Sequence, residues 1–228
     1  MTVSRFFAPL ALALVLGACS PPPLALAQEG AVLAPAPVVD MPRSSATSQV
    51  AVLAGGCFWG VEGVFEHVRG VTRVRSGYAG GDLRRANYDA VSSGTTGHAE
   101  SVEITFDPRV ISYGQILQIY FSVATDPTQL NRQGPDTGTQ YRGNIFYADP
   151  QQERVARAYI AQLASARTYS APIVTRVDRL VRFVPAEDYH QNYLELHPTQ
   201  PYIVRNDLPK IANLRRLFPG RYTTERAA

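Results

Sequence analysis

The sequence is poor in thiols and in lysine, and it lacks a long apolar segment. Its 228 residues include only two cysteines, Cys19 and Cys57, and Lys210 is the single lysine among 22 basic residues. Arginine in place of lysine is typical of high-GC codon usage. The longest apolar run, 6–16, is shorter than the ~20 residues that span a bilayer as a helix.

The charge pattern excludes a nucleic-acid-binding surface of the usual kind. The formal net charge is only +3, and the basic residues are scattered rather than gathered in a run, so we expect no nucleic-acid partner. An apolar content of 45% with 18% charged residues is typical of a soluble globular domain and not of a disordered chain. The length suffices for one domain with a sizeable core and extra sequence at an end.

The first residues are typical of an export signal. Arg5 supplies a minimal positive start, and the short apolar run that follows has the length of a signal-peptide core. Leu16-Gly17-Ala18-Cys19 matches the bacterial lipoprotein signal, which predicts a signal peptide over 1–18 and a lipid on Cys19. The alternative is ordinary cleavage after Ala27, which removes Cys19. Both alternatives predict an exported protein, in the periplasm or anchored to a membrane by its N-terminal lipid.

A change in composition divides the rest of the chain. Residues 19–48 are rich in Pro, Ala and Ser, which predicts an extended tether. Periodic patterns begin at Gln49, so we expect one folded domain over 49–220 and a short tail at 221–228. Because Cys19 is either acylated or removed, Cys57 is expected to be the only free thiol.

Strand and helix patterns alternate along this domain, which predicts an α/β (α+β) fold. Periodicity does not decide between parallel and antiparallel strand order. A polar loop at 125–142 is long enough to suggest a functional role. We expect strands at 50–54, 71–78, 98–106, 145–147 and, as a hairpin or a bent strand, 173–183, and helices at 57–70, from 112, 150–166, 186–196 and 207–218.

Cys57 lies where a thiol can become reactive. Gly55 and Gly56 separate it from a buried strand, and a helical pattern begins beside it. The first turn of a helix favours negative charge and hence the thiolate. Phe58 and Trp59 add two aromatic surfaces. The alternatives are a buried structural cysteine and, for Trp59, ordinary core packing.

Six stretches of the sequence resemble those of the A-type methionine sulfoxide reductases, in the same order and over about 49–218. This resemblance implies a two-layer sandwich, with helices packed on a mixed or antiparallel sheet in a ferredoxin-like plait. It also implies reduction of the S epimer of methionine sulfoxide, free or in proteins, and hence repair of oxidised proteins. The stretches are Gly55–Gly60, Gly77–Gly81, Gly94–Glu100, Asp126–Thr128 with Asn131–Gly134, Asp136–Arg142 and Ala186–Gln191.

The same resemblance implies a role for individual residues. Cys57 would attack the sulfoxide sulfur and Glu100 would protonate its oxygen, while Tyr88 and Tyr141 would donate hydrogen bonds to that oxygen. Alternation in the strand places Glu100 among apolar neighbours, and an apolar setting raises the pKa of a carboxyl group so that it stays protonated. Without the resemblance, Glu100 is equally a surface carboxylate, and the tyrosines are scaffold residues.

Further roles follow by the same route. Phe58 and Trp59 would hold the methyl group of the substrate, and Asp136 would support the site by hydrogen bonds. No bound cofactor or metal is expected, because the four histidines lack zinc-ligand spacing and are interpreted as structural or hydrogen-bonding residues.

The chain ends without the C-terminal cysteines that many members of this family use to resolve the sulfenic acid. We therefore expect a single-cysteine cycle, in which an external thiol, a thioredoxin-like protein or a small thiol, reduces the Cys57 sulfenic acid. The other expected partners are oxidised proteins and free methionine sulfoxide, and we expect a monomer. Two alternatives remain: another cysteine enzyme, such as a thiol peroxidase or a hydrolase with His98 as its base, and a non-catalytic module that binds methionine-like groups.

Overall fold

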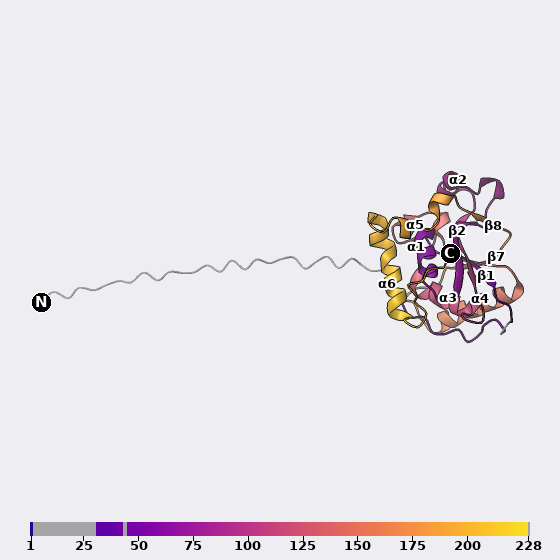
Figure 1. Ribbon diagram of the computed structural model, residues 1–228, viewed down its shortest axis with the longest axis horizontal. Coiled ribbons are helices and arrows are strands. Elements are labelled where there is room, and N and C mark those ends of the chain that lie inside the picture. The colour runs from indigo at the N-terminus through magenta and orange to yellow at the C-terminus, as the bar shows by residue number, and fades with distance from the viewer. Residues whose placement is uncertain (2–30, 43–44, 228) are drawn as a thin grey trace.

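A six-stranded sheet forms the centre of the protein (Figure 1). The computed structural model describes residues 1, 31–42 and 45–227. The strand order is β7-β6-β1-β3-β2-β8. The strands are β1 (Gln49–Ala54), β2 (Val71–Ala79), β3 (Ala99–Phe106), β6 (Asn144–Tyr147), β7 (Arg176–Arg179) and β8 (Phe183–Pro185).

The four central strands follow the topology of a ferredoxin-like plait. Helix α1 (Phe58–Glu66) connects β1 to β2, and α3 (Tyr113–Ile119) lies between β3 and β6. β1 pairs antiparallel with both β3 and β6, and β2 pairs antiparallel with β3, whereas β7 is parallel to β6. The expected mixed sheet with helices packed on it is confirmed. In Figure 1, α1, α5 (Tyr193–Leu196) and α6 (Leu208–Leu217) gather on one side of the strands.

Both faces of the central strands are buried. The main core lies between the sheet and the helices, and a second, smaller core of Val52, Ala54, Ala79, Ala99 and Phe146 occupies the other face. For this reason the first four residues of β3 are all buried, although their sequence predicts a half-buried strand.

Side chains cap the starts of two helices. Ser112 caps α3 in a reciprocal capping box with Gln115. Asp149 accepts hydrogen bonds at the start of α4 (Pro150–Ser165). The Gln152 side chain accepts from the N–H of Ala148, one residue before the cap, and donates to Val50 O in β1. Gln152 therefore ties α4 to the sheet.

The expectation of a hairpin or bent strand at 173–183 is wrong. β7 and β8 lie at opposite edges of the sheet, paired with β6 and β2. The connection between them crosses the second core, where Leu180 and Phe183 pack. Burial of these two side chains accounts for the crossing, and periodicity does not reveal it.

Two stretches expected to be loops contain short elements. The glycine-rich stretch before β3 includes a 3₁₀ turn, Leu83–Arg85, and helix α2 (Tyr88–Ser92). The polar loop includes a two-stranded ladder, β4 (Arg132–Gln133) with β5 (Asp136–Thr137), and the 3₁₀ turn η3 (Thr139–Tyr141). Near the C-terminus, the turns η4 (Asp188–His190) and η5 (Ile203–Asp207) precede α5 and α6 respectively.

Residues 31–42, which fall within the expected tether, pack against the domain as an N-terminal strap. Ala34 is fully buried, its N–H donates to Ser122 Oγ over 3.1 Å, and its carbonyl accepts from Gln118 Nε2 over 2.9 Å. Asp40 accepts from the N–H of Gly114 over 2.8 Å. Packing therefore begins well before Gln49 in the described chain.

Residues 2–30 lie outside the described part of the chain, whereas the C-terminal tail lies within it up to Ala227. The expected lipidation residue Cys19, the signal peptide after Met1 and the first part of the tether lie outside the described residues. Within the described part, no helix is both long and apolar enough to cross a bilayer. The expected tail packs on the end of α1, where the N–H of Thr223 donates to His67 O and that of Ala227 to Glu66 O, both over 2.9 Å.

Candidate active site

Cys57 occupies the cap position of α1, immediately after the turn that leaves β1. Gly56 in that turn has φ +95°, and a Cβ there would lie 2.6 Å from the side chain of Gln133, so both the backbone angle and the close approach require glycine. The Cys57 side chain is buried, with 8% of its surface exposed. The predicted order of strand, two glycines, cysteine and helix is confirmed.

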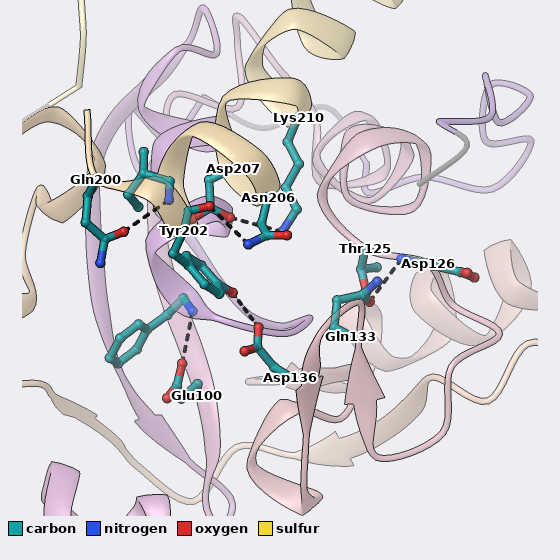
Figure 2. A network of polar contacts seen from close by, with 12 residues as sticks. Glu100, Thr125, Asp126, Gln133, Asp136, Gln200, Tyr202, Asn206, Asp207 and Lys210 are labelled. Carbon is teal, nitrogen blue, oxygen red and sulfur yellow. Dashed lines mark hydrogen bonds and ion pairs between the residues drawn. The ribbon is translucent and has the colours of Figure 1, made fainter. Parts of the chain in front are cut away.

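Glu100 lies beside Cys57 because of the strand register. β1 and β3 are adjacent and antiparallel, with Leu53 paired to Val102. The last residues of β1 and the first residues of β3 therefore lie side by side at one end of the central strands. The N–H of Phe58 donates to Glu100 Oε2 over 3.1 Å (Figure 2). This bond links the carboxyl group directly to the first turn of α1.

The Glu100 carboxyl is 3% exposed, and burial raises its pKa to about 8. The carboxylates of Asp136 and Asp207 add to this rise, and the N–H of Phe58 opposes it. These surroundings favour the protonated carboxyl group at neutral pH, in the direction that the sequence predicts.

The pKa of the Cys57 thiol moves in the direction opposite to the one expected from its helix position. Burial raises it well above its usual value, and Glu100, Asp207 and Asp136 add to the rise. The N–H of Trp59, in the first turn of α1, lowers it, but this contribution is outweighed. These surroundings therefore favour the thiol form of Cys57 at neutral pH.

The structure brings Tyr88 and Tyr141 to the same site, although they come from α2 and η3. The pKa of each phenol is raised, first by burial and also by the charges of Glu100 and Cys57, so both phenols lie within electrostatic reach of these groups. Tyr88 is held by its own N–H, which donates to Glu187 Oε1 over 2.9 Å. Both phenols can donate a hydrogen bond without adding charge.

Aromatic side chains form one wall of the site. The Phe58 ring is buried, whereas the Trp59 ring stacks on Tyr193 with centroids 3.7 Å apart and planes at 8°. The Trp59 Nε1–H donates to His190 Nδ1 over 3.2 Å, and the His190 ring lies 5.0 Å from that of Phe58. His190 is thus a hydrogen-bonding residue, as expected. Tyr193 was not predicted as a site residue, because its contact with Trp59 spans most of the domain and no local sequence pattern marks it.

Asp136 is held at the site by a residue that the sequence analysis also missed. The hydroxyl of Tyr202, at the cap position just before η5, donates to Asp136 Oδ2 (Figure 2). The pKa of Tyr202 is raised by burial and by the nearby charges of Cys57 and Asp207. Tyr202 is one of 12 tyrosines, and no spacing marks it in the sequence.

Two other chemistries find little support in this arrangement. Within the described chain, no group of three or more His, Cys, Asp or Glu side chains could hold a metal ion. His98 Nδ1 accepts from the N–H of Gly81 over 3.3 Å, and its Nε2 lies 3.0 Å from Asp82 O. Because backbone groups of that loop engage both ring nitrogens, His98 is not placed as the base of a cysteine hydrolase.

Comparison with known proteins agrees with this site. A sequence model of the family described as peptide methionine sulfoxide reductase matches residues 49–219. The chain belongs to this family. It is 58% identical over 181 residues to peptide methionine sulfoxide reductase MsrA 2 of Mesorhizobium japonicum, covering 79% of this chain and 93% of the relative. The MsrA 2 of Synechocystis is 50% identical over 187 residues, with coverages of 81% and 87%.

Solved structures show the same family fold. Methionine sulfoxide reductase A of Corynebacterium diphtheriae superposes with a TM-score of 0.59 at 32% identity, covering 77% of this chain and 92% of that one. The reduced form of Mxr1 from Saccharomyces cerevisiae gives a TM-score of 0.62 at 28% identity, with coverages of 72% and 94%. The A-type assignment from the sequence stretches is confirmed, and the chain is an oxidoreductase of this family.

Proposed function

We propose that the protein reduces the S epimer of methionine sulfoxide, in proteins or free, with Cys57 as the nucleophile and Glu100 as the acid. The observation that carries this proposal is a buried thiol beside a buried, protonated carboxyl group that is fixed by the Phe58 N–H. A sulfoxide sulfur becomes electrophilic only when its oxygen is protonated or strongly hydrogen-bonded, and this pair supplies both the acid and the nucleophile.

The aromatic wall and the two phenols suit the two ends of the sulfoxide group. Phe58 and Trp59 offer an apolar surface to the methyl group, with a favourable sulfur–aromatic contact. Tyr88 and Tyr141 donate hydrogen bonds to the oxygen. Asp136, held by Tyr202, supports this arrangement from the other side.

The reaction moves one oxygen atom and two electrons. Cys57 sulfur attacks the sulfoxide sulfur as its thiol loses a proton, which forms a sulfur–sulfur bond, and Glu100 delivers a proton to the sulfoxide oxygen. The hydroxyl group formed in this way then moves to the Cys57 sulfur, as the sulfur–oxygen bond of the substrate and the sulfur–sulfur bond both break. The sulfoxide is reduced to methionine, and Cys57 is oxidised to the sulfenic acid. The thiol proton restores Glu100, so the sum is sulfoxide plus thiol giving thioether plus sulfenic acid.

An external thiol completes the cycle. Cys57 is the one cysteine among the described residues, and it is unpaired. A first external thiol displaces water from the sulfenic acid to form a mixed disulfide, and a second thiol releases Cys57 and leaves as the disulfide. A thioredoxin-like protein or a small thiol can fill this role, and no bound cofactor is needed.

We further propose that the enzyme acts outside the cytoplasm. The support is the N-terminal sequence alone, where Leu16-Gly17-Ala18-Cys19 follows a short apolar run. Mass spectrometry of the mature N-terminus distinguishes the two export routes: a diacylated Cys19 supports membrane anchoring, an N-terminus after Ala27 supports release, and an intact leader contradicts export.

The test of the activity compares the separated S and R epimers of a peptide methionine sulfoxide, with dithiothreitol as reductant. We expect turnover of the S epimer alone and its loss in Cys57→Ser. Reduction of both epimers, or full activity of Cys57→Ser, contradicts the proposal.

A further inference from the structure

The single lysine of the chain is buried beside the reaction site. Lys210, in the first turn of α6, is only 9% exposed, and its Nζ lies 3.5 Å from Asp207 Oδ1. Asp207 is fully buried at the end of η5. Codon usage explains why the other basic residues are arginine, but it does not explain why a lysine is retained in the interior, where an isolated charge is costly.

Both charges of this pair contact the first turn of α1. A Cβ built on Gly60, three residues after Cys57, would lie 2.1 Å from Asp207 Oδ1 and 3.0 Å from Lys210 Nζ. The pair therefore packs directly against the backbone that carries the nucleophile.

Acidic groups reach Cys57 from three sides. Glu100 comes from β3, Asp136 from β5 and Asp207 from η5. Lys210 is the cation joined to the last of these, and it lies with Asp136 and Tyr202 on the wall of a cleft of about 840 Å³. The uncharged titratable groups that face Cys57 are the phenols of Tyr88, Tyr141 and Tyr202.

The charge of Asp207 acts on the nucleophile and on the acid together. It raises the pKa of the Cys57 thiol and also that of the Glu100 carboxyl group. A positive charge next to Asp207 opposes this effect, because opposite charges a few ångströms apart cancel much of each other's field.

We propose that the buried Asp207–Lys210 pair is a positioning pair that sets the protonation balance of the reaction site. Asp207 favours the thiol at Cys57 and the neutral acid at Glu100, and Lys210 limits that effect so that the thiol still ionises when the sulfoxide binds. This inference rests on the proposed roles of Cys57 and Glu100, and both residues of the pair act through the charges that they place near these two groups.

The experiment measures the pH dependence of Cys57 alkylation by iodoacetamide in the full chain, read by mass spectrometry of the peptide that contains Cys57. Asp207→Asn removes a negative charge, so it should lower the pH midpoint and speed alkylation at neutral pH by about tenfold, the equivalent of one pKa unit. Lys210→Met should raise the midpoint by a similar amount. The double variant should return close to the wild-type midpoint.

One further variant controls for general charge effects. Glu153→Gln breaks the exposed Glu153–Arg157 pair on α4 and should leave the midpoint unchanged. If Lys210→Met fails to fold, the other two variants still test the inference. The alkylation midpoint should be lowered in Asp207→Asn and should stay close to the wild-type value in the double variant.

Melting temperatures separate a structural role from the proposed one. If the variants change stability while the alkylation midpoint stays at the wild-type value, or if both single variants shift it in the same direction, the inference is overturned. Alkylation needs no sulfoxide, so this result is independent of whether the protein reduces methionine sulfoxide.

Discussion

At the residue scale, Cys57 and Glu100 share one physical condition. Both are buried where β1 ends and β3 begins, and burial opposes the charged form of each. The free enzyme therefore holds two protons, one on the sulfur and one on the carboxyl group. Because the reaction consumes a proton at the sulfoxide oxygen and releases one from the thiol, this resting state is the productive one.

Replacement of Glu100 tests the acid directly. Glu100→Gln should lower kcat/KM by about 10²–10⁴-fold, because the amide hydrogen-bonds to the sulfoxide oxygen but cannot protonate it. In the wild type, kcat/KM should fall as the pH rises through about 8, where Glu100 loses its proton. The pH profile of both proteins on a peptide sulfoxide is the measurement.

Glu103→Gln is the matched control for this prediction. Glu103 lies on the same strand but pairs with Arg75, away from the thiol, so its variant should keep both the rate and the alkaline decline. A Glu100→Gln variant that keeps the wild-type profile would rule out the acid role.

A second buried carboxyl group affects stability rather than catalysis. Burial, with Glu66 as the next cause, raises the pKa of Glu62 to about 8. The folded-state pKa of Glu62 lies above the unfolded value near 4.3. The stability that the neutral form contributes is therefore lost progressively as the pH rises from about 4.3 through about 8. Glu62→Gln, which cannot ionise, should show a shallower fall in melting temperature over this range. An unchanged fall would contradict the assignment.

At the element scale, features that depend on neighbouring residues could be predicted from the sequence, and features that depend on long-range contacts could not. The capping box of α3 and the turn before Cys57 depend on neighbouring residues, so the sequence reveals them. The separation of β7 from β8 depends on Leu180 and Phe183 reaching a second core, which no periodicity shows. At the site, the family resemblance indicated Glu100 and the strand pattern indicated its apolar neighbours, whereas Tyr202 meets Asp136 across 66 residues with no local signal.

The contact between α1 and η5 can be tested at Gly60. Alanine in a helix adds about 1 kcal/mol over glycine, but its Cβ would lie 2.1 Å from Asp207 Oδ1, and overpacking of this kind costs about 1–3 kcal/mol. Gly60→Ala should therefore lower the free energy of unfolding in urea. Gly220→Ala, where nothing lies within 4 Å, is the control and should be close to neutral. A Gly60→Ala variant as stable as the wild type would show that this contact is loose.

The N-terminal strap gives a prediction about the extent of the folded unit. A variant that begins at residue 49 loses the buried Ala34 and its hydrogen bonds to Gln118 and Ser122, so it should melt at a lower temperature than a variant that begins at residue 31. Differential scanning calorimetry of the two variants is the measurement. Equal melting temperatures would mean that the strap adds nothing to the domain.

At the scale of the whole molecule, the plait explains why the site lies at one end of the central strands. Strand order places β1 and β3 side by side in opposite directions, which brings Cys57 and Glu100 together from positions 43 residues apart. The fold class and this pairing could be anticipated from the sequence and its family resemblance. The aromatic wall and the Asp136–Tyr202 bond required the three-dimensional structure, because their partners come from the C-terminal third of the chain.

In the proposed cycle, Cys57 alone accepts the oxygen. The most direct measurement is a single turnover of the fully reduced enzyme with excess S sulfoxide and no reductant, in which the methionine formed is counted and the mass of the protein is determined. We expect one methionine per enzyme and one added oxygen, located on Cys57. No methionine, more than one per enzyme, or an intramolecular disulfide in place of the added oxygen would contradict it.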